Sequence, residues 1–118
     1  MTVSYKDRVQ SRQQAQPACI SNMRWNIEQR TIVIRDMMVT LTPTEYRLLS
    51  PLQHGKPVTY TNLARQAYNC ALDEKVRKMM DKHIDRIRGK LQGTGAYIYC
   101  ILSYGYVLLD EVIPEEEV

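Results

Sequence analysis

The chain has 118 residues, of which 44% are hydrophobic and 25% are charged, and its formal net charge at pH 7 is +3. This length and composition are typical of one globular domain with a single core, and they exclude an enzyme with separate cofactor and substrate domains. No apolar run approaches the ~20 residues of a membrane helix, and the N-terminus lacks the pattern of a secretory signal. We therefore expect a cytoplasmic protein that does not enter the membrane.

The cysteines and histidines predict neither a disulfide framework nor a metal site. Cys19, Cys70 and Cys100 are odd in number and widely spaced. Free thiols in a reducing cytoplasm explain such cysteines better than disulfides do. A zinc site would need paired Cys-x-x-Cys or His-x-x-x-His spacing, which the sequence lacks. We expect no metal and no other cofactor.

The positive charge is concentrated in one short segment. Residues 75–91 contain seven basic and two acidic side chains, a net charge of +5, whereas residues 92–118 contain five acidic and no basic ones. A localised basic element is typical of a protein that binds a polyanion. A solvated helix face would carry the same charges without a partner, so the charge alone leaves both interpretations open.

The N-terminal part of the chain changes character at about residue 18. Residues 1–17 are polar and end at a proline, which is typical of a flexible leader or an interdomain linker. Over residues 18–41, short apolar or alternating groups between turn-forming residues predict three or four antiparallel strands. These strands begin a predicted domain over residues 18–110, and residues 111–118 are expected to form an acidic tail.

Two capping patterns predict the starts of two helices. Thr42 is placed as an N-cap, Pro43 fits the first helical position, and Glu45 completes a capping box. This helix is expected to end at residues 54–57, which contain a glycine and a proline. After a short extended piece, Thr59 can cap a second helix.

The third predicted helix, at about residues 74–91, is the longest and the most periodic. Its apolar side chains recur at intervals of three and four residues, which places them on one face. They are Val76, Met79, Met80, His83, Ile84, Ile87 and Leu91. Residues 97–101 and 106–109 then flank a turn that contains a glycine, and this pattern predicts a β-hairpin.

A small sheet, three helices and a hairpin, in this order, indicate an α+β fold of the winged helix-turn-helix type. In a helix-turn-helix, the second helix of the pair lies in the major groove of DNA, where base edges can be read. The sequence resembles the DNA-binding effector domain of OmpR/PhoB-type response regulators in three blocks, which keep their order and spacing. These blocks are Leu41-Thr42-Pro43-Thr44-Glu45-Tyr46 with Leu48-Leu49, then Asp81-Lys82-His83-Ile84-Asp85-Arg86-Ile87-Arg88-Gly89-Lys90-Leu91, and then Tyr97-Ile98 with Gly105-Tyr106-Val107-Leu108.

The resemblance implies sequence-specific binding of double-stranded DNA by a bacterial transcription regulator, with the helix at about residues 74–91 in the major groove. By position, Lys78 matches a DNA-contacting residue at the helix start. His83 matches a histidine near the phosphate backbone. His83 also falls on the apolar stripe, so a role at the edge of the core stays open. The candidate DNA-binding residues are Lys75, Lys78, Lys82, His83, Arg86, Arg88 and Lys90.

Two features depart from the family pattern. No lysine or arginine follows Lys90, so the wing lacks the basic residue that can enter the minor groove in the family. Asp85 stands where the family commonly has a basic residue. Leu102 and Tyr104 predict an apolar wing tip that contacts another protein or a second copy of the chain. The alternative function is therefore a winged-helix protein-interaction module with weak or no DNA binding.

The resemblance also implies partners besides DNA. Family members commonly bind direct repeats as tandem dimers, and residues 69–74 resemble a loop that some relatives present to RNA polymerase. The receiver domain of two-component regulators is not in this sequence, which leaves an excised C-terminal domain and a stand-alone regulator as alternatives. Neither histidine has a nucleophile or carboxylate at motif spacing, and no glycine-rich phosphate loop occurs, so we expect no enzymatic activity.

Overall fold

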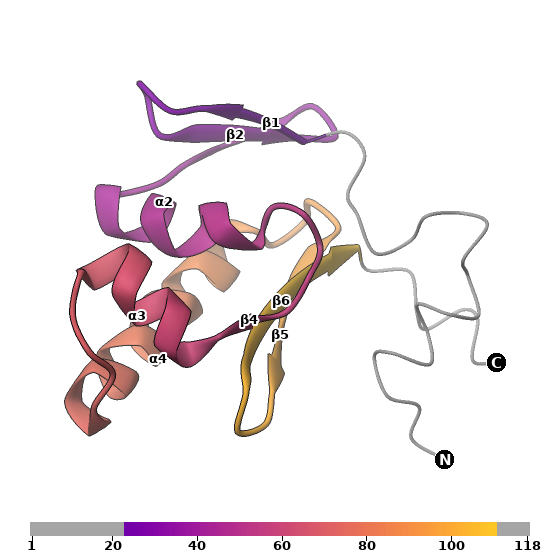
Figure 1. The fold of residues 1–118 in the computed structure, drawn as a ribbon. Coiled ribbons are helices and arrows are strands. Elements are labelled where there is room, and N and C mark those ends of the chain that lie inside the picture. The colour runs from indigo at the N-terminus through magenta and orange to yellow at the C-terminus, as the bar shows by residue number, and fades with distance from the viewer. Residues whose placement is uncertain (1–22, 111–118) are drawn as a thin grey trace, which may run out of the picture.

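Two small sheets pack against three helices in the computed structural model of the chain, which describes residues 23–110 (Figure 1). The first sheet is formed by β1 (Met23–Asn26), β2 (Thr31–Ile34) and β3 (Met37–Thr40), which are antiparallel and adjacent in that order. The predicted strands of this part of the chain are confirmed as three. The predicted leader and the acidic tail lie outside the described residues.

A tight turn connects β2 and β3. Arg35 and Asp36 form a two-residue turn in which both have positive φ angles, 48° and 70°. Such a turn matches the natural twist of a β-hairpin. The Arg35 side chain then reaches the second sheet: it donates to the carbonyl oxygen of Thr94 at 2.7 Å and pairs with Asp110. The first sheet is therefore held to the body by polar contacts as well as by its apolar face.

The first helix, α2 (Pro43–Leu49), begins as the sequence predicts but ends earlier. The Thr42 side chain accepts a hydrogen bond from the backbone N–H of Glu45 at 3.1 Å, and Glu45 accepts one from the N–H of Thr42 at 2.9 Å. The predicted end at residues 54–57 is wrong. The α-helix stops at Leu49 and continues as a 3₁₀ turn, η2 (Ser50–Leu52), because Pro51 has no N–H to donate.

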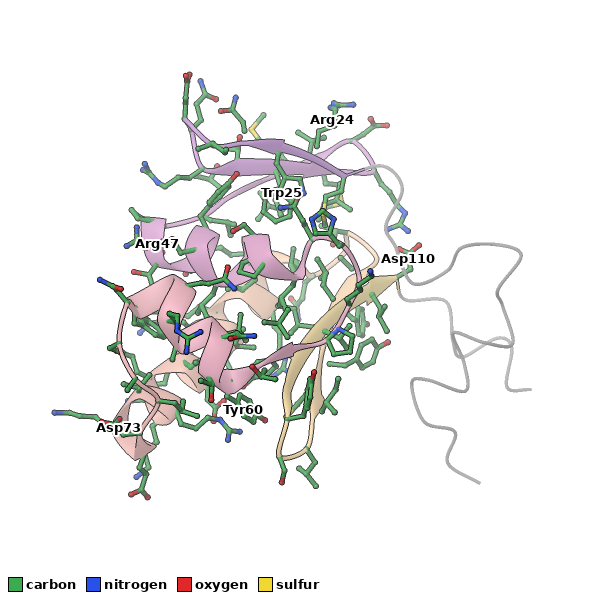
Figure 2. All side chains as sticks on the ribbon, viewed as in Figure 1. Arg24, Trp25, Arg47, Tyr60, Asp73 and Asp110 are labelled. Atoms are coloured by element: carbon green, nitrogen blue, oxygen red, sulfur yellow. The ribbon has the colours of Figure 1, made fainter. Side chains whose placement is uncertain are left out.

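The next two helices form the helix-turn-helix. Thr59 caps α3 (Tyr60–Tyr68), which ends at Asn69 in the left-handed conformation. Asp73 caps α4 (Glu74–Lys90), and Figure 2 shows this residue at the start of that helix. The helix expected at about residues 74–91 is thus confirmed to within one residue. No helix within residues 23–110 is long and apolar enough to cross a membrane.

The short extended piece predicted before α3 forms a third strand of the second sheet, a pairing that the sequence did not predict. The hairpin of β5 (Ala96–Ile101) and β6 (Gly105–Asp110) is confirmed, and β4 (Val58–Thr59) pairs with β6 to give the order β4-β6-β5. A Cβ atom on Gly105 would collide with the backbone of Val58. The glycine therefore permits the close approach of these two strands.

The core is built from every one of these elements. Side chains without any exposed surface come from the first sheet, the three helices and the wing; they include Ile32, Ile34, Leu48, Leu49, Leu63, Met80, Ile84, Ile87 and Val107. The apolar face of α4 is narrower than predicted. Met79 was expected in the core, but it is 38% exposed because it lies at the margin of the buried face. His83 and Val76 are half-buried.

Candidate nucleic-acid interface

The side of α4 opposite the core carries a row of cations, which we call the cationic stripe: Lys75, Lys78, Lys82 and Arg86. Spacings of three and four residues place these four side chains on one face of the helix. All four are exposed, and none has a hydrogen bond or ion pair to another residue of the described part of the chain. Their charged groups are therefore available to a polyanion.

Arg88 lies on α4 as predicted, but its guanidinium is occupied. Its Nε and Nη2 atoms donate to the carbonyl oxygen of Ile98 at 3.1 and 3.0 Å, and Nη1 donates to Asp85 at 3.1 Å. The side chain thus bridges α4 and β5. Contact with a phosphate would have to compete with these three bonds.

Lys90 has a partner on another helix. Its ammonium group lies 2.6 Å from a carboxylate oxygen of Glu45, whose side chain is almost completely buried. Burial alone would raise the pKa of Glu45, but the hydrogen bonds from Lys90 and Thr42 outweigh it and hold the pKa below its ordinary value. This ion pair connects the end of α4 to the start of α2.

His83 faces α3 rather than the cationic stripe. Its Nδ1 atom lies 2.9 Å from the hydroxyl of Tyr68, and the two ring centroids are 5.9 Å apart. Burial, with a smaller effect of Cys70, raises the pKa of Tyr68 to about 12, so this hydroxyl stays protonated. When it donates to Nδ1, the ring proton of neutral His83 resides on Nε2.

A polar cluster that sequence reasoning missed joins α4 to α3 and to the wing. The guanidinium of Arg77 stacks 3.6 Å from the ring centroid of Tyr60 and donates to its hydroxyl at 3.0 Å. Asp81 accepts from Arg77 at 3.4 Å and from the hydroxyl of Tyr106 on β6. Figure 2 shows Tyr60 at the start of α3, beside the wing. The i, i+4 spacing of Arg77 and Asp81 was the one signal in the sequence.

The tyrosines of this cluster remain protonated. Burial and the hydrogen bond to Asp81 raise the pKa of Tyr106. Burial and the hydrogen bond with Cys100, whose sulfur is 3.4 Å from the hydroxyl, raise the pKa of Tyr60 to about 12. Both hydroxyls can therefore donate at neutral pH, and the cluster stays intact there.

The tip of the wing is apolar and exposed, as the sequence predicts. Leu102 is 87% exposed and Tyr104 is 45% exposed. The backbone carbonyl of Tyr104 accepts from the N–H of Tyr60 at 2.9 Å, which connects the turn to the start of α3. The hairpin between residues 96 and 110 contains no lysine or arginine.

Comparison with known proteins identifies a family and several similar structures. Residues 36–108 match the family described as "Transcriptional regulatory protein, C terminal". A search of curated proteins found no match. Among solved structures, the DNA-binding domain of CpxR from E. coli has 20% identity and a TM-score of 0.65, over 79% of this chain and 95% of that one.

Two further structures are similar over most of this chain. The response regulator AdeR DNA-binding domain, in complex with an intercistronic region, has 26% identity and a TM-score of 0.59, over 78% of this chain and 96% of that one. A structure described as a novel family of redox sensors in the streptococci has 27% identity and a TM-score of 0.63. The match covers 80% of this chain but only 42% of that one.

The fold and the sequence motifs thus agree with the comparisons. The winged helix-turn-helix fold expected from the sequence is confirmed by the similarity to these DNA-binding domains. The family match covers more than half of the chain and includes α2, α3, α4 and most of the wing. The protein therefore belongs to the family of C-terminal domains of transcriptional regulatory proteins, the DNA-binding domains of OmpR/PhoB-type response regulators.

Proposed function

We propose that the protein binds specific sites on double-stranded DNA through α4, which enters the major groove, and that it acts as a regulator and not as an enzyme. The observation that carries the proposal is the cationic stripe. Its four cations lie on one face of the helix and have no partner within residues 23–110. An α-helix fits the major groove, and lysine and arginine neutralise phosphates or reach guanine there.

The candidate DNA-binding residues divide into two groups in this proposal. We assign direct DNA contact to Lys75, Lys78, Lys82 and Arg86. The contacts of Arg88 and Lys90 with Ile98 and Glu45 favour a role in orienting α4 against the wing and α2. His83 belongs between the groups, since its Nδ1 contacts Tyr68, and Nε2 can donate to a phosphate when the Tyr68 hydroxyl is the donor of that contact.

The test is a binding titration of the full chain against a random duplex pool at several salt concentrations. For wild type, the logarithm of the binding constant should fall linearly with the logarithm of the salt concentration. The double variant Lys82→Ala/Arg86→Ala should bind more weakly, and its slope should be smaller by about 2 because each lost phosphate contact removes about 0.9.

The matched control removes two exposed cations elsewhere. Arg24 lies on β1, far from α4 (Figure 2), and Lys56 lies in the turn before β4. The variant Arg24→Ala/Lys56→Ala has the same net charge as the test variant. It should keep the wild-type slope to within about 0.5. Equal losses in both double variants would contradict a defined interface on α4 and indicate attraction by net charge alone.

The wing favours a second candidate function, a protein-interaction module. A tip with an 87% exposed leucine and no cation is suited to an apolar contact with protein and not to the minor groove. The same titration separates the two functions. An apolar protein contact is insensitive to salt, and a chain that binds no duplex at low salt would support this second candidate.

We further propose that the protein works in the cytoplasm, that two copies bind neighbouring sites, and that RNA polymerase is a third partner.

The loop between α3 and α4 is the candidate contact with the polymerase. In this loop Cys70 and Ala71 are exposed, and Leu72 is half-buried against the core. The loop directly precedes α4, so a protein bound there would lie next to the N-terminal end of the cationic stripe.

A further inference from the structure

A carboxylate lies among the cations on the outer side of α4. Asp85 is three residues after Lys82 and directly precedes Arg86, and its side chain is 72% exposed. At close range a carboxylate repels phosphate, so Asp85 weakens the attraction of the cationic stripe for the DNA backbone. A role in phosphate binding is therefore excluded for this residue.

Asp85 is held in place from the wing. One carboxylate oxygen accepts from Nη1 of Arg88 at 3.1 Å, while the other two donors of Arg88 are fixed on the carbonyl of Ile98. Within residues 23–110 the second carboxylate oxygen has no hydrogen bond. Arg88 thus orients the carboxylate and leaves it acceptor capacity.

The surface next to Asp85 is open. Gly89 follows one turn later on the same side of α4, and a Cβ atom added there would have no neighbour within 4 Å. Because residues four apart on a helix are neighbours, the missing side chain at position 89 leaves this side of Asp85 uncovered, and the Asp85 side chain is 72% exposed. The edge of a base pair can therefore approach the carboxylate closely.

The chemistry of the major groove then selects one base. Only cytosine and adenine present amino groups there, N4 and N6. Adenine also presents the acceptor N7 beside its amino group, which repels a carboxylate, whereas cytosine presents no acceptor of its own. We propose that Asp85 is a specificity-determining residue that selects a C·G base pair by accepting a hydrogen bond from cytosine N4. This inference rests on the proposed binding of DNA through α4.

The experiment is a selection from a random duplex pool with the full chain as wild type, Asp85→Asn and Asp85→Ala. The wild-type motif should contain a position occupied by cytosine. Asp85→Asn should change that position alone to adenine, because an amide pairs with adenine N6 and N7. Asp85→Ala should lose the preference at that position. In titrations, replacing this cytosine should weaken wild-type binding roughly 10-fold and leave Asp85→Ala unaffected.

Asp36→Asn is the matched control, since it removes the same charge from an exposed turn between β2 and β3. It should select the wild-type motif. If wild type and Asp85→Asn select the same base at every position, the inference is overturned while DNA binding stands. A wild type that binds duplex without sequence preference would overturn the inference in the same way. If wild type binds no duplex at low salt, the proposed function fails and the inference falls with it.

Discussion

Glu45 connects the start of α2 to the end of α4 through one carboxylate. It closes the capping box of α2 by accepting from the N–H of Thr42, and it pairs with Lys90 at the end of α4. Its side chain is 3% exposed, so a missing partner would not be replaced by water. The charge of this residue therefore contributes to the stability of the contact between α2 and α4.

The lowered pKa of Glu45 makes this contribution depend on pH. A carboxyl whose pKa is lower in the folded state stabilises the fold above its ordinary value of 4.5, and the stabilisation is lost as the pH falls through the folded pKa. Glu45→Gln should therefore reduce the free energy of unfolding by about 1–3 kcal/mol at pH 7. The deficit relative to wild type should shrink well below pH 4.5. Urea unfolding of both proteins at pH 7 and well below pH 4.5 measures this deficit.

Glu28→Gln provides the control, because Glu28 is exposed in the β1–β2 turn and has no hydrogen bond or ion pair within the described residues. Its free energy of unfolding should stay within about 0.5 kcal/mol of wild type. A deficit of Glu45→Gln that is the same at pH 7 and at low pH would mean that the ion pair with Lys90 contributes nothing.

At the residue scale, the sequence predicted the contacts between residues that are close in the chain, but not those between distant residues. The capping box of Thr42 and Glu45 could be read directly, because both partners lie within one turn. The partners of Lys90 and Arg88 could not, since Glu45 is 45 residues away and Ile98 is on another element. Composition and spacing alone do not distinguish such cations from Lys82 and Arg86, which have no partner in residues 23–110.

At the scale of elements, polar contacts connect α4 to its neighbouring elements on every side except the one that carries the cationic stripe. Lys90 connects it to α2, His83 to α3, Arg88 to β5 and Asp81 to β6. The orientation of the recognition helix is thus determined by polar contacts around a buried apolar face. Loss of one contact should therefore affect DNA binding through orientation and not through charge.

Tyr106→Phe tests this on a single hydroxyl group. The phenyl ring keeps the edge-on packing against Tyr60, while Asp81 loses its donor on β6. We expect a loss of about 1–2 kcal/mol in the free energy of unfolding and weaker binding to the selected DNA site. The salt slope should not change, because no cation is removed.

Tyr104→Phe removes a hydroxyl that has no hydrogen bond within residues 23–110, and it should match wild type in both measurements. Should Tyr106→Phe bind the selected site as tightly as this control does, the Asp81–Tyr106 contact has no part in orienting α4. A change in the salt slope would instead indicate that the surface of α4 has rearranged.

The elements that the sequence mispredicted are short or depend on distant partners. The extended piece at β4 was predicted, but its pairing was not, because two residues are too few for a periodic pattern and the pairing depends on Gly105, which lets β6 approach. The end of α2 was placed too late because Leu52 continues the apolar pattern, although Pro51 had already changed the helix type. The longer elements, with their own caps and periodicity, were predicted within one or two residues.

At the scale of the whole molecule, the three most exposed large apolar side chains of residues 23–110 lie at two opposite ends. The first sheet presents Ile27 and Met38, and the tip of the wing presents Leu102. Figure 1 shows this sheet and the wing tip at opposite ends of the fold, with the helices between them. Two different patches on one chain are suited to a head-to-tail contact, in which successive copies keep the same orientation.

Such a contact predicts the arrangement of the DNA sites. Copies that keep the same orientation read direct repeats, and centres about one helical turn apart place both α4 helices on the same side of the duplex. The protein should therefore bind two direct repeats of its selected site at least about 10-fold more tightly than one site, and with two copies per duplex. Native mass spectrometry and titration measure the stoichiometry and the affinity.

An inverted repeat of the same site is the control duplex, because it would require a symmetric contact between identical patches. It should bind two copies independently, each with the affinity of a single site. Leu102→Ser should abolish the gain on the direct repeat and leave the affinity for a single site unchanged, since the wing tip carries no cation. Equal affinity for direct and inverted repeats would contradict the head-to-tail contact and leave the exposed wing tip to a different protein.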